Sequence, residues 1–248
     1  MRFLMTKRVG DARFPHTNYK ASKYCIAYLD ILGGTDIIRR DDKSEHLNII
    51  NMIFHDVINE SKIFVHKEDD DIFVKVFSDN ILIAIKTDTE HKKSNIEKII
   101  GLVSDIIQEA SDYGYLLRGA ITEGDFFCND IFVYGKALLD VIDMESKYAI
   151  YPRVIVKKEI ANLLPQYFYV CADGWYAINY YILDIGAFSL NYKITLLKQL
   201  KNNKKDKKVR QKIMFAITDL NIINGEMRKI GALNHQIITH EEIENAVK

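Results

Sequence analysis

The sequence has little cysteine, proline or tryptophan, and it carries no surplus of charge of either sign. Its 248 residues include 3 Cys, 3 Pro and 1 Trp, and 34 Lys+Arg residues balance 34 Asp+Glu residues to a formal net charge of +0. No strong overall field therefore draws the chain to nucleic acid or to a membrane surface. No apolar run approaches the length of a membrane span, and charges follow the first apolar residues too soon for a secretory signal, so we expect a cytoplasmic protein.

The few cysteines, Cys25, Cys128 and Cys171, lie far apart in the sequence and show no C-x-x-C spacing. Each one sits within an apolar run. Such cysteines are typical of buried free thiols in a reducing compartment, and they exclude a disulfide framework.

The remaining composition is that of an ordinary globular protein, with 48% hydrophobic and 27% charged residues. A chain of this length suits one large domain, or a domain with an appendage, and it can bury a sizeable core. We predict a main domain over residues 20–160 and a C-terminal α-helical appendage over residues 161–248, packed on the same domain.

The stretch YCIAYLDILGGT, Tyr24 to Thr35, is the most informative part of the chain. Its apolar start predicts a central strand buried on both faces, and the strand ends in one acid, Asp30. Burying a lone carboxylate costs several kcal/mol, so such an acid usually pairs with a cation. Gly33 and Gly34 allow a tight turn that brings backbone N–H groups close to an anion. The stretch indicates a metal and a phosphate held side by side; the alternative is that Asp30 merely caps the next helix.

Periodicity orders the main domain as strand, helix, strand, strand, helix, strand. Helical spacing is found within residues 41–66 and 95–112, a hairpin joins strands 72–77 and 81–85, and a fourth strand follows at 115–122. This order predicts an α+β fold with the ferredoxin-like βαββαβ arrangement, in which the first and third strands lie side by side and antiparallel. The end of the first strand then meets the hairpin turn, and Asp30 lies beside Asp79. Alone, Asp79 would be a turn former, but two adjacent acids beside a glycine turn favour a two-metal site for phosphoryl transfer.

The rest of the chain gives weaker signals. We predict a short strand at 131–134, a helix from Gly135 to Lys147, a strand at 154–156 and a long helix at 207–229. The basic run Lys201 to Arg210 precedes that long helix and has no interleaved aromatic residues, so we interpret it as a solvated loop or helix start and not as a nucleic-acid site.

These motifs together resemble the class III nucleotidyl cyclases. The string Asp30 to Thr35 is similar to the family motif Asp-Ile-x-Gly-Phe-Thr and departs from it at Gly34. The FSD sequence ending at Asp79 stands where the family has its second metal-binding Asp, Ala120 to Gly124 matches the later Gly-Ile-His-x-Gly motif more loosely, and Gly135 matches the glycine that opens the following helix. The resemblance covers about residues 24–156. The strings RGAITEGD, YGKALLDVIDMES, YPRVIV and CADGW further resemble the stand-alone pyrimidine cyclases of bacterial Pycsar anti-phage defence.

Departures from the purine cyclases bear on the substrate. The Asn and Arg that those enzymes place on the helix after Gly135 are here Leu139 and Asp143. Their base-reading Asp is here Phe132, whereas Lys75 matches the base-contacting Lys of adenylate cyclases. The resemblance therefore implies a pyrimidine nucleotide, with UTP favoured and CTP next, cyclised to the 3′,5′-cyclic monophosphate with release of pyrophosphate.

The resemblance also implies which groups form the site. Two Mg²⁺ or Mn²⁺ ions would be held by Asp30, Asp79 and the carbonyl of Ile31, and Arg118 would be a catalytic replacement for the missing transition-state Arg. The remaining predicted substrate-binding residues are Leu32, Gly33, Gly34 and Thr35 for the phosphates, Lys75 and Phe132 for the base, and Arg153 as a second candidate cation.

The partners that the resemblance implies are a second copy of the chain, giving a homodimer with composite sites, and a separate effector protein that reads the cyclic nucleotide during anti-phage defence. Two alternatives stay open: a purine cyclase with an unusual pocket, and a catalytically dead cyclase fold that senses nucleotides. The missing Asn and Arg favour the second alternative, while the presence of both metal-binding acids opposes it.

Overall fold

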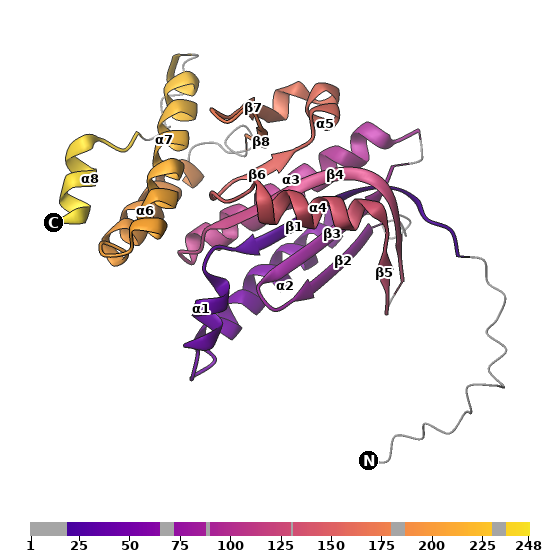
Figure 1. Ribbon diagram of the computed structural model, residues 1–248, viewed down its shortest axis with the longest axis horizontal. Coiled ribbons are helices and arrows are strands. Elements are labelled where there is room, and N and C mark those ends of the chain that lie inside the picture. The colour runs from indigo at the N-terminus through magenta and orange to yellow at the C-terminus, as the bar shows by residue number, and fades with distance from the viewer. Residues whose placement is uncertain (1–18, 65–71, 88–89, 130, 180–186, 230–236) are drawn as a thin grey trace.

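In the computed structural model, strand β1 lies in the middle of a mixed sheet (Figure 1). The structure describes residues 19–64, 72–87, 90–129, 131–179, 187–229 and 237–248. Among them the strands are β1 (Ser22–Ile31), β2 (Ile72–Phe77), β3 (Asn80–Lys86), β4 (Leu117–Cys128), β5 (Val133–Tyr134), β6 (Val154–Val156), β7 (Phe168–Val170) and β8 (Tyr176–Ile178). These form an 8-stranded sheet in the order β2-β3-β1-β4-β6-β8-β7, with β5 paired to β4. Strand β1 runs antiparallel to both neighbours, and β6 is parallel to β4.

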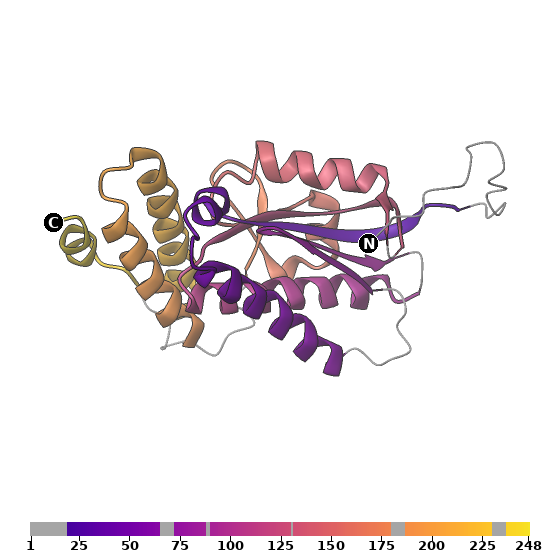
Figure 2. The same cartoon turned by 90° about the horizontal axis from the view of Figure 1, so that it is seen from below.

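Helices cover both faces of the sheet and one of its ends (Figure 2). They are α1 (Gly34–Arg39), α2 (Glu45–Phe64), α3 (Lys92–Asp112), α4 (Lys136–Lys147), α5 (Lys158–Leu163), α6 (Ala187–Asn202), α7 (Lys207–Lys229) and α8 (His240–Val247), with one 3-10 turn, η1 (Pro165–Tyr167). Helices α2 and α3 lie on one face, α4 on the other, and α6 to α8 stand at the end of the sheet.

Side-chain alternation along β1 explains this layering. Cys25, Ala27 and Leu29 point into the core shared with α2 and α3, while Ile26 points into a second core under α4. Because both faces of β1 are buried, the strand reads as a continuous apolar run in the sequence. Its last even-numbered position, Asp30, therefore lies on the α4 face.

The predicted fold class is confirmed, and so is the antiparallel pairing of the first and third strands. The strand at 154–156 and the helix at 207–229 have the predicted bounds. Helix α2 lies within the predicted helical segment 41–66, and the short α1 before it was not predicted. Two strand bounds were wrong: β4 continues to Cys128, and β5 is limited to two residues. The first 18 residues and the acidic run 68–71, which precedes β2, lie outside the described residues.

The C-terminal part joins the main domain closely. Strands β7 and β8 extend the same sheet, and residues of α6 and α7 belong to the same core as α2 and α3. On α6, the Thr195 hydroxyl donates to the Ser111 carbonyl at 2.7 Å, and the Gln199 amide donates to the Gly114 carbonyl at 2.6 Å. One sheet and one core include residues on both sides of position 160/161. The domain division proposed there stays a prediction.

Two further expectations concern cysteine and membranes. Cys25 and Cys171 are buried free thiols as predicted, but Cys128 is only partly buried, because it lies near the end of β4 beside the short β5. Over the described ranges, every helix is too short or too polar to cross a membrane.

Candidate active site

Asp30 stands at the end of β1 between two later strands. In the sheet register it faces Asn80 on β3 and Arg118 on β4. Arg118 donates from Nε to Asp30 Oδ2 at 2.8 Å, and its Nη2 lies 2.8 Å from the same oxygen. Burial raises the pKa of the Asp30 carboxyl, and the Arg118 charge opposes that rise. The partly buried acid is thus paired with a cation, as its place in an apolar strand requires.

Asp79 reaches the same edge from the turn between β2 and β3. It is buried at 6% exposure, and the Ile31 N–H donates to the Asp79 carbonyl at 3.2 Å. The Asn80 amide donates to Asp79 Oδ1, also at 3.2 Å. A Cβ placed on Gly34 would come within 2.0 Å of Asp79 Oδ2, so the carboxylate rests directly on the glycine backbone. The predicted meeting of Asp30 and Asp79 follows from β1–β3 pairing, and each carboxylate lies in the electrostatic field of the other.

The glycine turn links these acids to helix α1. Gly33 has φ 82, a left-handed conformation that suits glycine, and its carbonyl accepts from the N–H groups of Asp36 and Ile37 at 3.1 Å. The cap of α1 is Gly33, without a side-chain hydrogen bond, so the interpretation of Asp30 as a helix cap is wrong. The Leu32 N–H donates to the Leu116 carbonyl at 2.8 Å, and Thr35 is exposed on the first turn of α1. The first N–H groups of a helix have no partner within it, so this turn presents donors beside the two acids.

A third acid, Glu145 on α4, was missed by the sequence analysis. It is 5% exposed, and its Oε1 lies 2.8 Å from Arg118 Nη2, at ion-pair distance but without good hydrogen-bond geometry. Burial raises the pKa of Glu145, and Arg118 opposes the rise. The sequence held a signal: Ala137, Val141 and Met144 form the buried stripe of α4, and Glu145 falls on that same stripe.

A second cation, Lys212 on α7, was also missed. It is half-buried, and its charge interacts with those of Arg118, Asp30 and Glu145. Burial lowers the pKa of Lys212, and the nearby Arg118 lowers it further. No local pattern distinguishes Lys212 from the other lysines of its basic neighbourhood, because only tertiary packing brings α7 to this edge of the sheet.

Lys75 and Phe132 lie at different distances from the acids. In the sheet register, Lys75 on β2 pairs with Leu82 on β3, and Leu82 pairs with Tyr28 on β1. Lys75 therefore lies on the same face of the sheet as Asp30, two strands or about 10 Å from β1. Phe132 instead packs near Phe127 at the far end of β4, with ring centroids 6.3 Å apart. Phe127 is nine residues along the strand from Arg118, or about 30 Å. One chain therefore does not bring Phe132 to its own acids.

Arg153 lies in a separate cluster. It is 1% exposed, donates from Nη1 to Asp173 Oδ1 at 2.9 Å, forms a second, shorter contact with Asp173, and stands over the Phe215 ring at 5.1 Å. These contacts hold both terminal nitrogens of the guanidinium inside the protein, while its Nε is buried without a hydrogen-bond partner among the described residues. The structure therefore does not bring Arg153 together with the other predicted site residues.

The donor atoms near Asp30 and Asp79 suit Mg²⁺-type ions, although they are too few to complete the coordination of two ions. The described residues contain no group of three or more His, Cys, Asp or Glu side chains arranged to hold a metal. Mg²⁺ commonly uses only one or two carboxylates and takes its other ligands from phosphates and water. Asp30, Asp79 and the Ile31 carbonyl match that donor set, which is oxygen only and incomplete without a substrate.

No profile of a known protein family matches this sequence, and no curated protein matches it by sequence. Among solved structures, the fold is similar to the monomeric guanylyl cyclase domain of the RhoGC fusion protein from the aquatic fungus Blastocladiella emersonii, with a TM-score of 0.52 and 13% identity over 65% of this chain and 96% of that one. The catalytic core of a rhodopsin-guanylyl cyclase with converted specificity, in complex with ATPαS, gives a TM-score of 0.49 and 14% identity over 65% of this chain and 97% of that one. A bacterial light-regulated adenylyl cyclase gives a TM-score of 0.44 and 13% identity over 71% of this chain and 100% of that one.

The similarity to the guanylyl cyclase domain of RhoGC shows that this chain has the fold of a nucleotidyl cyclase domain.

Proposed function

We propose that this protein is a two-metal nucleotidyl cyclase that converts a nucleoside triphosphate to its 3′,5′-cyclic monophosphate and pyrophosphate. The observation that carries the proposal is the meeting of Asp30 and Asp79 on paired strands, directly beside the glycine turn that opens α1. Buried acids at such a turn, in a cyclase fold, are best explained by cations and phosphates.

Asp30, Asp79 and the Ile31 carbonyl would hold two Mg²⁺ or Mn²⁺ ions, which lower the pKa of the ribose 3′-hydroxyl and neutralise the triphosphate when they are bound. The turn from Gly33 to Thr35 would present backbone donors to the phosphates, whereas the Leu32 N–H is already bonded to the Leu116 carbonyl. Arg118 supplies a guanidinium at the same edge, where Glu145 and Asp30 hold its orientation. A guanidinium in this position can stabilise the charge that develops on the phosphate oxygens.

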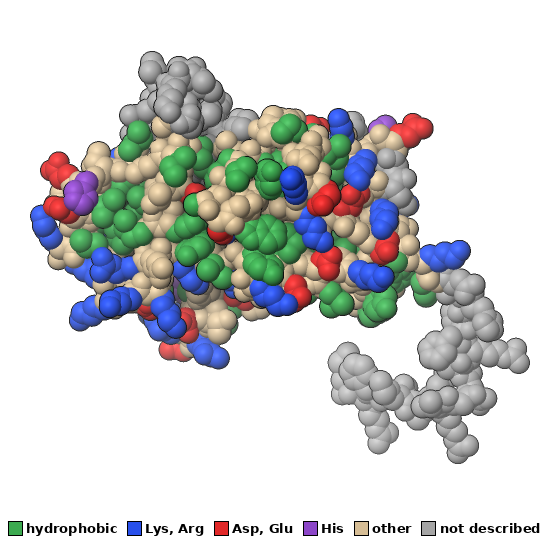
Figure 3. All heavy atoms as spheres, turned by 45° about the horizontal axis from the view of Figure 1, so that its top comes forward, with side chains coloured by type: hydrophobic (Ala, Val, Ile, Leu, Met, Phe, Trp, Pro, Cys, Tyr) green, Lys and Arg blue, Asp and Glu red, His purple; other side chains and the backbone are tan. Residues whose placement is uncertain are grey.

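The site is complete only with a second copy of the chain. Phe132 lies about 30 Å along β4 from the acids of its own chain, so a base pocket that includes it must come from the partner. Exposed apolar side chains near this end support a homodimer: Phe132 is 53% exposed, Tyr134 65% and Leu139 68%. Apolar side chains are also exposed among charged ones over the face seen in Figure 3.

We further propose a pyrimidine substrate, UTP first and CTP next. On α4, the positions where purine cyclases carry Asn and Arg hold Leu139, which is exposed, and Asp143, whose carboxylate is 2.7 Å from Lys147. Lys75 remains on the Asp30 face to contact a base. With the string resemblances described above, this supports a cyclic pyrimidine nucleotide that a separate effector reads in anti-phage defence.

A nucleotide sensor without activity is the second candidate, and the loss of the α4 Asn and Arg favours it. Incubating the purified protein with ATP, GTP, CTP or UTP separately, with Mn²⁺, and identifying products by mass separates the cases. Cyclic UMP or cyclic CMP supports the proposal, cyclic AMP or cyclic GMP alone indicates a purine cyclase, and no product with tight nucleotide binding indicates the sensor.

Matched variants test the metal assignment. Asp30→Asn and Asp79→Asn should leave a folded protein with activity lowered by about 10³-fold or more. Asp42→Asn, at an exposed position just after α1, serves as the control and should keep full activity. Near-normal turnover in either site variant would rule out the assignment.

A further inference from the structure

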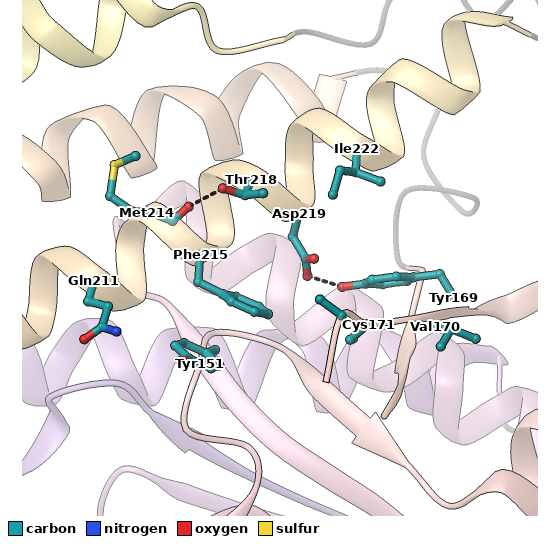
Figure 4. A pocket seen from close by; sticks show the side chains of 11 residues that line it. Tyr151, Tyr169, Val170, Cys171, Gln211, Met214, Phe215, Thr218, Asp219 and Ile222 are labelled. Carbon is teal, nitrogen blue, oxygen red and sulfur yellow. Dashed lines mark hydrogen bonds between the residues drawn. The ribbon is translucent and has the colours of Figure 1, made fainter. Parts of the chain in front are cut away.

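Helix α7, in the C-terminal part of the chain, delivers a charged side chain to the edge of the sheet where Asp30 lies. Three links fix its position. The Phe215 ring of α7 stacks on Tyr151 with centroids 4.0 Å apart and an interplanar angle of 9° (Figure 4). Arg153 lies over the same Phe215 ring, and its carbonyl accepts from the Gly119 N–H at 3.0 Å. Gly119 is the neighbour of Arg118 in β4, so these contacts place α7 close to the part of β4 that carries Arg118.

Lys212 precedes Phe215 by three residues and therefore lies on the same side of α7, about one turn away. Its side chain is half-buried, and its charge interacts with Asp30, Glu145 and Arg118, which belong to β1, α4 and β4. Among the described residues, Lys212 forms no ion pair or hydrogen bond of its own. The carboxylates of Asp30, Asp206 and Glu145 act on the Lys212 charge from a distance without an ion pair, so the partly desolvated ammonium stays available to an anionic ligand.

We propose that Lys212 binds the triphosphate tail of the nucleotide and the pyrophosphate leaving group, as a cation that α7 contributes in cis. This inference rests on the proposed function. It gives the C-terminal part a role in the site: α4 has lost a cation at Asp143, and α7 supplies one from another direction.

The charges support a phosphate ligand. Asp30, Asp79 and Glu145 are three acids at this edge, and Arg118 is already shared between Asp30 and Glu145 at 2.8 Å. Metal ions held by the acids would reverse the sign of the local field, and Lys212 would then face an anion and not carboxylates. An ammonium is a compact donor that suits the oxygens of a flexible polyphosphate.

Lysines close by in the sequence provide the contrast. Basic side chains gather at the end of the molecule formed by the C-terminal helices (Figure 3). Lys208 lies one turn before Lys212 on α7 and is exposed, and its N–H donates to the Asp206 carboxylate at the start of the helix. Lys208 is thus a control with the same charge, the same helix and no place at the site.

The test measures equilibrium binding, in Mn²⁺, of UTP as its 3′-deoxy analogue, which cannot be cyclised, and of UMP and inorganic tripolyphosphate to the full chain. Lys212→Met should weaken binding of UTP and tripolyphosphate on the order of 10-fold to 100-fold, because a charge-assisted hydrogen bond is lost, and should change UMP binding less than about 3-fold. Lys212→Arg should restore much of the loss, and Lys208→Met should bind all three as the unchanged protein does. Thermal unfolding of each variant checks that the fold is kept.

Equal losses for UTP and UMP, or none, would overturn the role of Lys212, since a structural lysine does not sense the length of the phosphate chain. Unchanged protein that binds UTP and depends on Lys212, yet makes no cyclic product, would support this inference and contradict the cyclase proposal. Unchanged protein that binds neither UTP nor tripolyphosphate would contradict both.

Discussion

Asp79 rests on a residue without a side chain, and this makes Gly34 a constraint on the site. A Cβ at Gly34 would lie 2.0 Å from Asp79 Oδ2 and 2.7 Å from Asp79 Cβ, far inside contact distance. The departure of this chain from the Phe of the family motif is therefore matched by the position of its second acid. The two residues have to be considered as a pair.

Gly34→Ala should displace the Asp79 carboxylate and lower activity by about 10²-fold, because displacing a ligand by an ångström is costly in a pre-organised site. Overpacking should also reduce the free energy of unfolding by about 1–3 kcal/mol. Activity assays and urea unfolding measure the two effects. Gly101→Ala in α3, where a Cβ meets nothing within 4 Å, should keep activity and stabilise by about 0.5–1 kcal/mol. Full activity in Gly34→Ala would contradict the close contact.

Arg153 shows how burial changes the interpretation of a basic residue. Asp173→Ala would strand a guanidinium that is 1% exposed, a change that costs about 3–5 kcal/mol for a fully buried pair. Because the Asp173 side chain is 44% exposed, solvent screens the pair and we expect a loss of about 1–3 kcal/mol in urea unfolding. The KM for nucleotide should not change. A raised KM at unchanged stability would return Arg153 to the substrate site.

At the scale of elements, a partly buried acid of α7, Asp219, forms a hydrogen bond to β7. The Tyr169 hydroxyl donates to Asp219 Oδ2 (Figure 4), next to a pocket of about 340 Å³ lined by Tyr151, Cys171, Met214 and Phe215. Burial raises the pKa of Asp219, and the hydrogen bond from Tyr169 opposes the rise. The protonated acid is therefore favoured in the folded state.

This direction sets the pH dependence. A carboxyl whose folded pKa is raised contributes stability below its unfolded pKa of about 4, and that contribution is lost as pH rises through the folded pKa. Asp219→Asn should accordingly flatten the fall in unfolding free energy as the pH rises above the unfolded pKa of the acid. Tyr169→Phe, which removes the opposing hydrogen bond, should steepen it. Urea unfolding at several pH values measures the slope for both variants. A steeper slope in Asp219→Asn would contradict the raised pKa of Asp219.

At the scale of the whole molecule, the composite site predicts that activity depends on self-association. Leu139 is 68% exposed on α4, near the end that holds Phe132. Leu139→Asp should convert a dimer to a monomer in sedimentation analysis and lower activity more than about 10-fold, because a charge in an apolar interface is left unpaired. Ile194→Asp on α6, at a position 55% exposed, should leave dimer formation and activity unchanged. An active Leu139→Asp monomer would contradict the composite site.

The sequence predicted the parts of the fold in which periodicity is strong and the hydrogen-bonded neighbours follow from topology. The order of β1 to β4 predicts that the end of β1 meets the β2–β3 turn, and the pairing of β1 with β3 brings Asp30 and Asp79 to the same edge. Short strands such as β7 and β8, of three residues each, carry too little alternation to be recognised, and α6 was hidden among apolar pieces. Lys212 could not be found, since its position depends on how α7 docks; Glu145 could have been, since an acid on an apolar stripe is a signal.

Strand β1 has one more consequence. It pairs on one side with β3 and on the other with β4, whose Arg118 lies 88 positions further along the chain. Pairings between such distant segments form slowly, and until β4 has been synthesised one long edge of an apolar ribbon stays uncovered. A ribosome that stalls before this point would release a fragment with a bare template for aggregation, so we expect such fragments to depend on chaperones for their solubility.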